Sequence, residues 1–377
     1  MAMTLLWGGD DASARALKYM RAGNATPMSI TLDTVKRTSP ALALMVPGDG
    51  DTWYANLTAV TDITVGGLYI NHNAITYAVT DNVDDMGSKF LVTTTPDTSS
   101  FSFNISAMGT FSIDWGDNTI EDIERTNTTD TTYSHTYATA GVYTIRIGGQ
   151  AQGYAPDNKV VAAISFTQNQ NVARIEGSLG AIFPTIGDGK TSGQQPVFAL
   201  TFSYCTNLTG SIPPELFAGI FGPPKMSMFG YTFAGCERLT GEIPENLFVG
   251  IEGAPAPYMF TYTFFGCSGL TGDIPSKLFA GIKGVPVDGM FSGTFADCRG
   301  LTSIGDGLFG DISGTAQNDM FGNTFYGCSA LRGSSARTTT GKYLYEIWPN
   351  ATTGQVSGCY NGASGLTDYA KMPSTWK

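Results

Sequence analysis

Residues 201–220 read TFSYCTNLTGSIPPELFAGI, and close copies follow as TFAGCERLTGEIPENLFVGI from Thr232, TFFGCSGLTGDIPSKLFAGI from Thr263 and TFADCRGLTSIGDGLFGDI from Thr294. Six cysteines mark the period, because the spacings between them are 31, 31, 31, 30 and 31 residues. A fixed period of about 20 to 50 residues indicates an array of stacked repeats. One such unit cannot bury its apolar face alone, so neighbouring units must share a continuous core.

Three apolar columns recur in register with the cysteines, and we expect each column to face the core as a ladder. Aligned units place phenylalanine in the first column, leucine in the second and methionine in the third: Phe202, Phe233, Phe264, Phe295 and Phe325; Leu208, Leu239, Leu270, Leu301 and Leu331; Met228, Met259, Met290 and Met320.

The cysteines are interpreted as core residues rather than as disulfides: Cys205, Cys236, Cys267, Cys298, Cys328 and Cys359. Equivalent positions of stacked units lie about 4.7 to 4.9 Å apart with parallel side chains, which suits small buried thiols better than the facing Cβ atoms of a disulfide. Metal ligation and a catalytic thiol are the alternatives, and the repeats lack the CxxC, the Cys/His pairs or the nearby histidine that these need. Free thiols fit folding in a reducing cytoplasm.

The LTGxIP segment predicts a short extended stretch that ends in a turn, because glycine allows close packing and proline ends a strand. The following ELFAGI, NLFVGI and KLFAGI pieces are too short for stable helices, so we expect one turn of α- or 3₁₀-helix. TFxxC followed by LTxxI resembles the BspA-like surface leucine-rich repeats, and LTGxIP is similar to the plant-type repeat. The 31-residue period exceeds the usual unit of both families, which predicts an extra loop such as FGPPKMSMFGY at 221–231. The resemblance implies a leucine-rich-repeat solenoid with atypical end caps over 151–377.

Upstream, FSIDWGDNTIEDI from Phe111 and TTYSHTYATAGVYTIRIGG from Thr131 alternate with period two between turn residues, which predicts antiparallel strands in a small β-sandwich. One set of residues resembles the DWGDG, HxY and GxYxV pattern of the PKD domain, with Asn118 in place of the last glycine of DWGDG: Asp114, Trp115, Gly116, Asp117, His135, Tyr137, Gly141, Tyr143 and Ile145. The resemblance implies an Ig-like spacer over 89–150, in which these residues make turn hydrogen bonds. The alternative is a weak calcium site that uses Asp117.

Residues 1–88 predict a small β-rich docking domain with one helix. DDASARALKYMRAG from Asp10 has the pattern of an amphipathic helix, and MSITLDTV, ALALMV, TWYANLTAV, DITVGGLYI and AITYAVT alternate like strands. We interpret His72 as a polar strand or turn residue. The chain as a whole is therefore expected to be mainly β, with three domains at 1–88, 89–150 and 151–377.

The composition excludes several classes of function. Lys+Arg 21 against Asp+Glu 32 gives a net charge of −11, so no basic field exists to bind nucleic acid or an anionic membrane surface. No apolar run of about 18 residues predicts membrane insertion, and the first residues lack the pattern of a secretion signal, unless such a signal has been removed. No serine-hydrolase, zinc-protease or nucleotide-binding motif is present, so we expect no enzyme, no cofactor and no metal.

Two non-enzymatic functions fit these features. In the first, the chain is a bacteriophage virion protein: residues 1–88 dock to other virion proteins in a homo-oligomer, and the repeats bind a glycan or protein on the host surface. In the second, the same modules form an exported bacterial cell-surface adhesin. Tyr204, Tyr231 and Tyr262 are the candidate ligand-binding residues, because aromatic rings at repeat spacing can stack on sugars; the alternative is that they are partly buried flanking residues.

Overall fold

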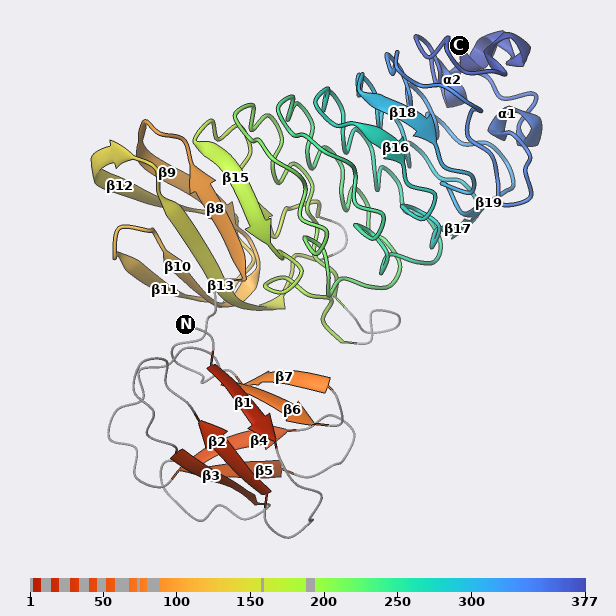
Figure 1. Cartoon of the computed structure of the whole chain (residues 1–377). Coiled ribbons are helices and arrows are strands. Elements are labelled where there is room, and N and C mark those ends of the chain that lie inside the picture. Colours follow the sequence, from red (N-terminus) through yellow and green to blue (C-terminus); the bar gives the residue numbers. More distant parts are fainter. Residues whose placement is uncertain are drawn as a thin grey trace. The chain divides into compact units, whose positions relative to one another are not determined.

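The computed structural model describes residues 89–156, 159–187 and 194–377, together with the backbone of seven strands within residues 1–88 (Figure 1). The chain divides into two compact units, Met1–Ser88 and Lys89–Lys377. Strands and turns dominate the described residues, helices are few, and several sheets are antiparallel. The prediction of a mainly β chain is therefore confirmed.

The strands of the first unit form one sheet in the order β4-β5-β3-β2-β1-β6-β7. Only β1 and β6 pair in parallel. The bounds are β1 (Met3–Trp7), β2 (Arg15–Tyr19), β3 (Met28–Asp33), β4 (Ala41–Met45), β5 (Thr52–Leu57), β6 (Leu68–His72) and β7 (Ile75–Val79). Strands β3, β4, β5 and β7 lie within predicted strand segments. Strand β6 overlaps only the last three residues of DITVGGLYI, and His72 ends it.

The prediction of a helix from Asp10 is wrong for residues 15–19, because these residues form β2, which pairs antiparallel with both β1 and β3. The sequence RALKY alternates with period two as well as it fits a helix turn, so its pattern decides neither. Two strand neighbours satisfy the backbone N–H and C=O groups of β2 from both sides.

The second unit begins with two antiparallel sheets, of order β11-β10-β13-β8-β15 and β12-β9-β14. Their strands are β8 (Phe90–Thr94), β9 (Thr98–Ile105), β10 (Met108–Asp114), β11 (Ile120–Arg125), β12 (Thr131–Gly141), β13 (Thr144–Gly153), β14 (Ile164–Ser165) and β15 (Val172–Gly177). Alternation buries one face of each sheet, as Phe111 and Ile113 show on β10. The rings of Phe103 on β9 and Trp115 lie 5.8 Å apart, so the two sheets share one core.

Strands that follow residue 150 complete both of these sheets. β13 crosses residue 150, β14 pairs with β9, and β15 pairs with β8. The core then continues into the repeats, because the ring of Phe166 stacks on Phe103 at 5.2 Å and on Phe202 at 5.5 Å. Figure 1 shows the two sheets at one end of the repeats and the C-terminus at the other.

Each repeat contributes a segment that we call the turn ribbon, residues 196–205, 227–236, 258–267, 289–298 and 319–328. Along the turn ribbon, successive backbone N–H groups donate in turn to a carbonyl oxygen of their own repeat and to one of the next repeat. Phe229 donates to Met259 O at 2.8 Å, whereas Gly230 donates to Ser227 O at 2.9 Å. The threonine before each phenylalanine is buried, and Thr263 Oγ1 lies 2.9 Å from carbonyl oxygens in its own and the preceding repeat. The backbone polar groups of the stack are thus satisfied largely between repeats.

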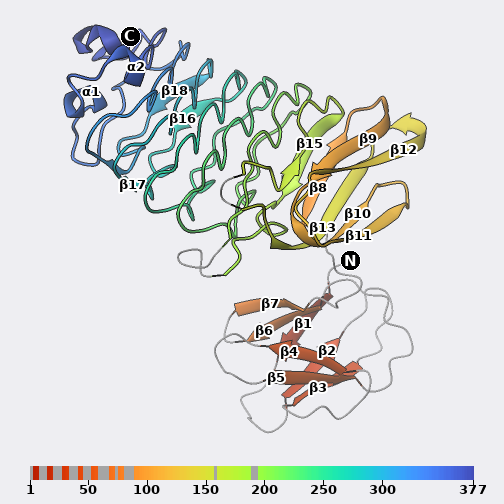
Figure 2. The same cartoon turned by 180° about the vertical axis from the view of Figure 1, so that it is seen from behind.

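Two further segments of each repeat pair in parallel with the next repeat, and Figure 2 shows successive repeats running side by side. The first contains the bridges Gly210 to Leu239 and Gly241 to Leu270, and the second contains Gly222 to Ile251 and Gly253 to Ile282. Later in the array the same pairings lengthen into the strands β16 (Gly272–Ile274), β17 (Lys283–Gly284), β18 (Leu301–Ile304) and β19 (Asp311–Ile312).

The predicted inward-facing columns are confirmed, because every phenylalanine, leucine and methionine in them is fully buried. Successive rings of the first column stack at 5.6 to 5.7 Å. The single turn expected in the ELFAGI pieces is present, because Leu216 N–H donates to Pro213 O. One local expectation is wrong. The expected extra loop at 221–231 runs into the turn ribbon, because Met228 and Phe229 fill the core.

The C-terminal segment covers the last repeat. It holds two one-turn helices, α1 (Leu344–Ile347) and α2 (Thr353–Val356), and two 3₁₀ helices, Tyr369–Lys371 and Ser374–Trp376. Tyr360 stacks on Phe325 at 5.3 Å, and the buried Trp376 lies 6.4 Å from the ring of Phe321. These rings take the place of the next repeat at the end of the array.

Candidate functional site

The turn ribbon holds a left-handed residue at every fourth position. In 227–236 these are Ser227, Tyr231 and Gly235, with φ of 53°, 58° and 72°. The equivalent residues form three columns along the array: Ser227, Tyr258, Gly289 and Asp319; Leu200, Tyr231, Tyr262, Gly293, Asn323 and Gly358; Gln168, Tyr204, Gly235, Gly266, Asp297, Gly327 and Gly362. Glycine, asparagine and aspartate tolerate this conformation, whereas a bulky residue is strained by about 1 to 2 kcal/mol.

Four strained tyrosines gather in the first repeats, and we call Tyr204, Tyr231, Tyr258 and Tyr262 the tyrosine row. The exposed fractions of the first three are 47%, 39% and 45%, and Tyr262 is partly exposed. The rings of Tyr231 and Tyr262 stack at 5.1 Å. The pKa of Tyr231 is raised by partial burial and, in part, by the neighbouring Tyr262 and Tyr204 phenols, which places three of these phenols in one cluster.

Each of three rings in the row leans over a glycine of the following repeat. A Cβ atom on Gly235 would lie 2.6 Å from the ring of Tyr204, and one on Gly293 would lie 2.3 Å from that of Tyr262. The ring of Tyr258 covers Gly289 in the same way. The absent Cβ atoms therefore allow the tyrosine rings to lie along the array as an aromatic surface.

The three predicted tyrosines are thus near one another, although Tyr204 lies in a different column from Tyr231 and Tyr262. Sequence reasoning missed Tyr258, which lies four residues before Tyr262. The available signal was the spacing of four between the inward rings Phe260 and Phe264, which differs from the period of a strand or a helix.

The residues of the DWGD and HTY motifs form a hydrogen-bonded turn. Asp114 Oδ1 accepts from Gly116 N–H at 2.8 Å, and Asp117 Oδ1 accepts from Thr119 N–H at 3.0 Å. His135 Nε2 lies 2.7 Å from Asp117 Oδ2, and this hydrogen bond is the largest cause that holds the pKa of Asp117 below its usual value.

Aromatic residues pack against that turn and bond to its backbone. The His135 ring stacks on the buried Trp115 at 5.3 Å, and the Tyr137 hydroxyl donates to Trp115 O at 2.9 Å. Gly141 ends β12, opposite Thr98. Within 89–156, 159–187 and 194–377, no three His, Cys, Asp or Glu side chains gather as a metal site.

All six cysteines are buried and unpaired. Five thiols donate to a carbonyl oxygen of the preceding repeat, as Cys236 does to Phe202 O at 3.0 Å. Burial raises the pKa of the Cys205 thiol to about 12 and that of Cys236 well above its usual value. The thiols are therefore held as neutral core groups.

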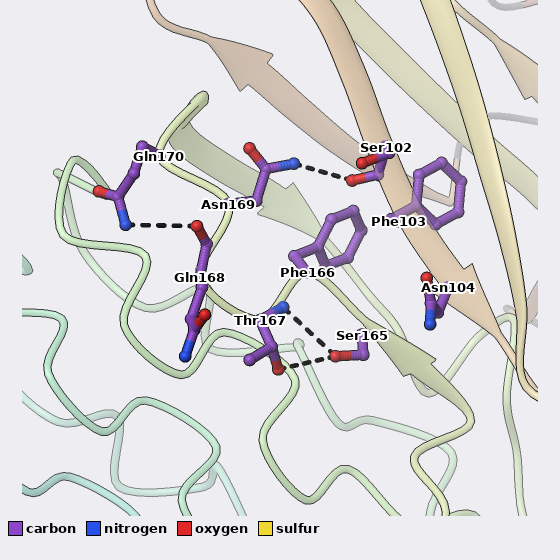
Figure 3. A pocket seen from close by; sticks show the side chains of 9 residues that line it. All are labelled: Ser102, Phe103, Asn104, Ser165, Phe166, Thr167, Gln168, Asn169 and Gln170. Atoms are coloured by element: carbon purple, nitrogen blue, oxygen red, sulfur yellow. Dashed lines mark hydrogen bonds between the residues drawn. The ribbon is translucent and has the colours of Figure 1, made fainter.

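A polar pocket of about 350 Å³ lies beside the tyrosine row, between β9 and residues 165–170 (Figure 3). Sequence reasoning did not single out any of its lining residues. The helices of the described ranges are short turns, and none has the length and apolar character needed to cross a membrane. Comparison of the chain with family models, with curated proteins and with solved structures finds no match.

Proposed function

We propose that this chain is a non-enzymatic, virion-associated structural and adhesion protein, which displays its repeats to glycans or proteins on a host cell. In this proposal the repeats are a leucine-rich-repeat solenoid with 31-residue coils, and the two sheets before them are a PKD-like spacer. Residues 1–88 dock the chain, as a homo-oligomer, to other virion proteins. The observation that carries the adhesive role is the exposed tyrosine row on strained backbone positions.

The strain supports binding because the fold does not require tyrosine at these positions. Gly289 and Gly293 take up the same conformation one repeat after Tyr258 and Tyr262. Strained residues persist where function needs their side chains. Exposed aromatic rings are also the groups that dominate binding energy at protein surfaces.

The six free thiols support assembly of the chain in a reducing cytoplasm, where virions are built. The alternative function, an exported bacterial cell-surface adhesin, is favoured by the TFxxC and DWGD motifs, which resemble those of surface proteins. Both functions use the same tyrosine row, so they differ in location and not in the binding surface.

Location is tested by detecting the chain in gradient-purified particles and in cell-envelope fractions. We expect it in the particles, and we expect a chain that lacks residues 1–88 to leave them while residues 89–377, a compact unit, stay folded. Recovery in the envelope alone would favour the adhesin. Particle association of the shortened chain would exclude docking through residues 1–88.

Binding is tested by replacing Tyr231 and Tyr262 with asparagine, the residue that the same column has at Asn323. We expect adhesion to host cells to weaken by about tenfold or more while the unfolding temperature is kept, because asparagine tolerates a positive φ. The matched control is Val249→Asn, which removes an exposed apolar side chain outside the turn ribbon. If the tyrosine variant adhered as well as Val249→Asn, the tyrosine row would not be part of the binding surface.

A further inference from the structure

The pocket beside the tyrosine row is lined by nine uncharged residues: Ser102, Phe103, Asn104, Ser165, Phe166, Thr167, Gln168, Asn169 and Gln170. Figure 3 shows amides and hydroxyls around its rim, with the rings of Phe103 and Phe166 behind them. Its volume of about 350 Å³ lies in the range of pockets that bind small ligands.

Some of these polar groups brace the pocket. Asn169 Nδ2 donates to Ser102 O at 2.8 Å and thereby ties residues 165–170 to β9. Asn104 Nδ2 donates to Asp130 Oδ2 at 2.8 Å, which leaves its Oδ1 as an acceptor. Among the described residues, the side-chain amide of Gln168 has no hydrogen-bond partner and is exposed. The rim therefore offers both donors and acceptors to a ligand.

The absence of charge from the lining selects the kind of ligand. An anion would need a cationic or clustered N–H partner, and a metal ion would need carboxylate or imidazole ligands. An apolar ligand would leave the rim amides without partners, which costs binding energy. A neutral molecule with many hydroxyl groups satisfies the same amides.

Two hydrogen bonds join the pocket wall to the backbone of the adjoining turn ribbon at Leu200 and Tyr204. Gln170 Nε2 donates to Tyr204 O at 2.8 Å, and Thr167 Oγ1 donates to Leu200 O. Gln168 occupies the ribbon column of Tyr204, because Gln168 N–H bonds to Ser203 O as Tyr204 N–H bonds to Ala234 O in the next repeat. The exposed ring of Tyr204 lies beyond this junction, over Gly235 of the following repeat.

Gln168 and Tyr204 are also strained, with φ of 58° and 55°. The next two residues of this column are Gly235 and Gly266, which take up the same conformation without that cost. Long side chains are therefore placed at the two positions beside the pocket although the backbone favours glycine there. Such an outlier supports a functional role for both side chains.

We propose that the pocket binds a neutral oligosaccharide, whose terminal sugar bonds to the amides of Gln168 and Asn104 and whose next ring stacks on Tyr204. A sugar ring combines hydroxyls at its edge with an apolar C–H face, and these two features match the pocket rim and the tyrosine ring. This site rests on the proposed adhesive function and gives its ligand a chemical class.

The test measures binding of the purified full-length chain to arrays of neutral hexose and N-acetylhexosamine oligosaccharides, with sialylated and uronic-acid oligosaccharides beside them. The variants are Gln168→Gly and Tyr204→Gly, and the matched control is Asp297→Gly, which relieves the same strain in the same column two repeats beyond Gly235. We expect neutral oligosaccharides to bind about tenfold more weakly to both variants and unchanged to the control.

Three results would overturn the proposal: no binding to any neutral oligosaccharide, binding to the acidic ones alone, or wild-type binding by both variants. Adhesion of the wild-type chain to host cells separates this site from the proposed function. If the chain adheres to cells without binding neutral oligosaccharides, the ligand is another molecule and the pocket assignment fails. If the pocket binds oligosaccharides while the chain adheres to no cell, the adhesive function fails and the site stands.

Discussion

The cysteines show how a single position serves both packing and polar satisfaction. A thiol is small enough for the interior of the stack, and its S–H group caps a carbonyl oxygen of the preceding repeat, as Cys267 does to Phe233 O at 3.1 Å. Alanine would remove that donor, and serine would bury a stronger polar group. Cysteine thus fits a position where a weak donor is needed within an apolar core.

Thiol reactivity should report unfolding of the stack. With a pKa of about 12, only about one Cys205 thiol in 10⁴ is ionised at pH 8, and burial blocks access to it. We expect a thiol reagent to find six slow cysteines in the native chain and six fast ones in denaturant. Ser329→Cys places an exposed thiol beside Cys328 and should react at once. Disulfides, or a fast native cysteine, would disprove the buried ladder.

The Asp117 carboxylate should contribute to acid stability. Its pKa in the folded chain is below the ordinary value of 3.8, mainly because of the hydrogen bond with His135. Its contribution is therefore complete above pH 3.8 and is lost as the pH falls through the folded pKa. We expect the free energy of unfolding of Asp117→Asn to be lower by about 1 kcal/mol near pH 4.5, with the difference shrinking toward pH 2.5.

Urea unfolding at several pH values measures this difference. Asp122→Asn is the matched control, because it removes an exposed carboxylate of β11 and leaves the bond to His135 intact. The Asp117 carboxylate would have no such role if Asp117→Asn and Asp122→Asn differed from the wild type by the same amount at every pH.

The parallel segments of three successive repeats approach the preceding repeat so closely that one residue of each must be glycine. In FVGI at 248–251, FAGI at 279–282 and FGDI at 309–312, a Cβ atom on the glycine would lie 2.0 to 2.4 Å from a backbone oxygen of the preceding repeat. The glycines concerned are Gly250, Gly281 and Gly310. This contact explains why glycine recurs at this position of the repeats. A turn alone does not require glycine there, because Gly250 and Gly281 have no positive φ.

Gly281→Ala should therefore disturb the contact between two repeats. Its Cβ atom would lie 2.4 Å from Ile251 O and 3.1 Å from Glu252 Cα, and backbone atoms cannot turn away as side chains do. We expect a loss of about 2 to 3 kcal/mol in the free energy of unfolding. Gly354→Ala in α2 is the control, with its nearest neighbour at 3.8 Å, and should be neutral or stabilising. Equal stability of the two variants would contradict the close approach.

The array was predictable from sequence because its columns repeat with a fixed period, and burial of Phe264, Leu270 and Met259 follows from that period alone. The path of the backbone within a repeat was not predictable, since the turn ribbon places residues with a period of four that belongs to neither strand nor helix. For this reason Tyr258 and Gln168 escaped notice. The pocket was hidden as well, because its two walls, β9 and residues 165–170, are about 60 residues apart in sequence.

The two sheets and the repeats should unfold as one body, because residues 151–187 belong to both. A fragment that begins at residue 151 would contain only the end of β13. In it, β15 would lose its partner β8, β14 would lose its partner β9, and the Phe166 ring would lose its contact with Phe103. The fragment would also lack Phe90, whose ring lies 6.1 Å from that of Phe202 in the first full repeat. An array that loses such a cap exposes its apolar end to water.

We therefore expect a fragment of residues 89–377 to unfold in one transition, at the temperature at which the same residues unfold in the full chain. A fragment of residues 151–377 should aggregate or unfold at least about 10 °C lower, since several buried aromatic contacts are lost at once. Calorimetry of both fragments measures this difference. A cooperative transition of residues 151–377 at the temperature of the longer fragment would instead establish the repeats as a domain of their own, with a boundary at residue 150.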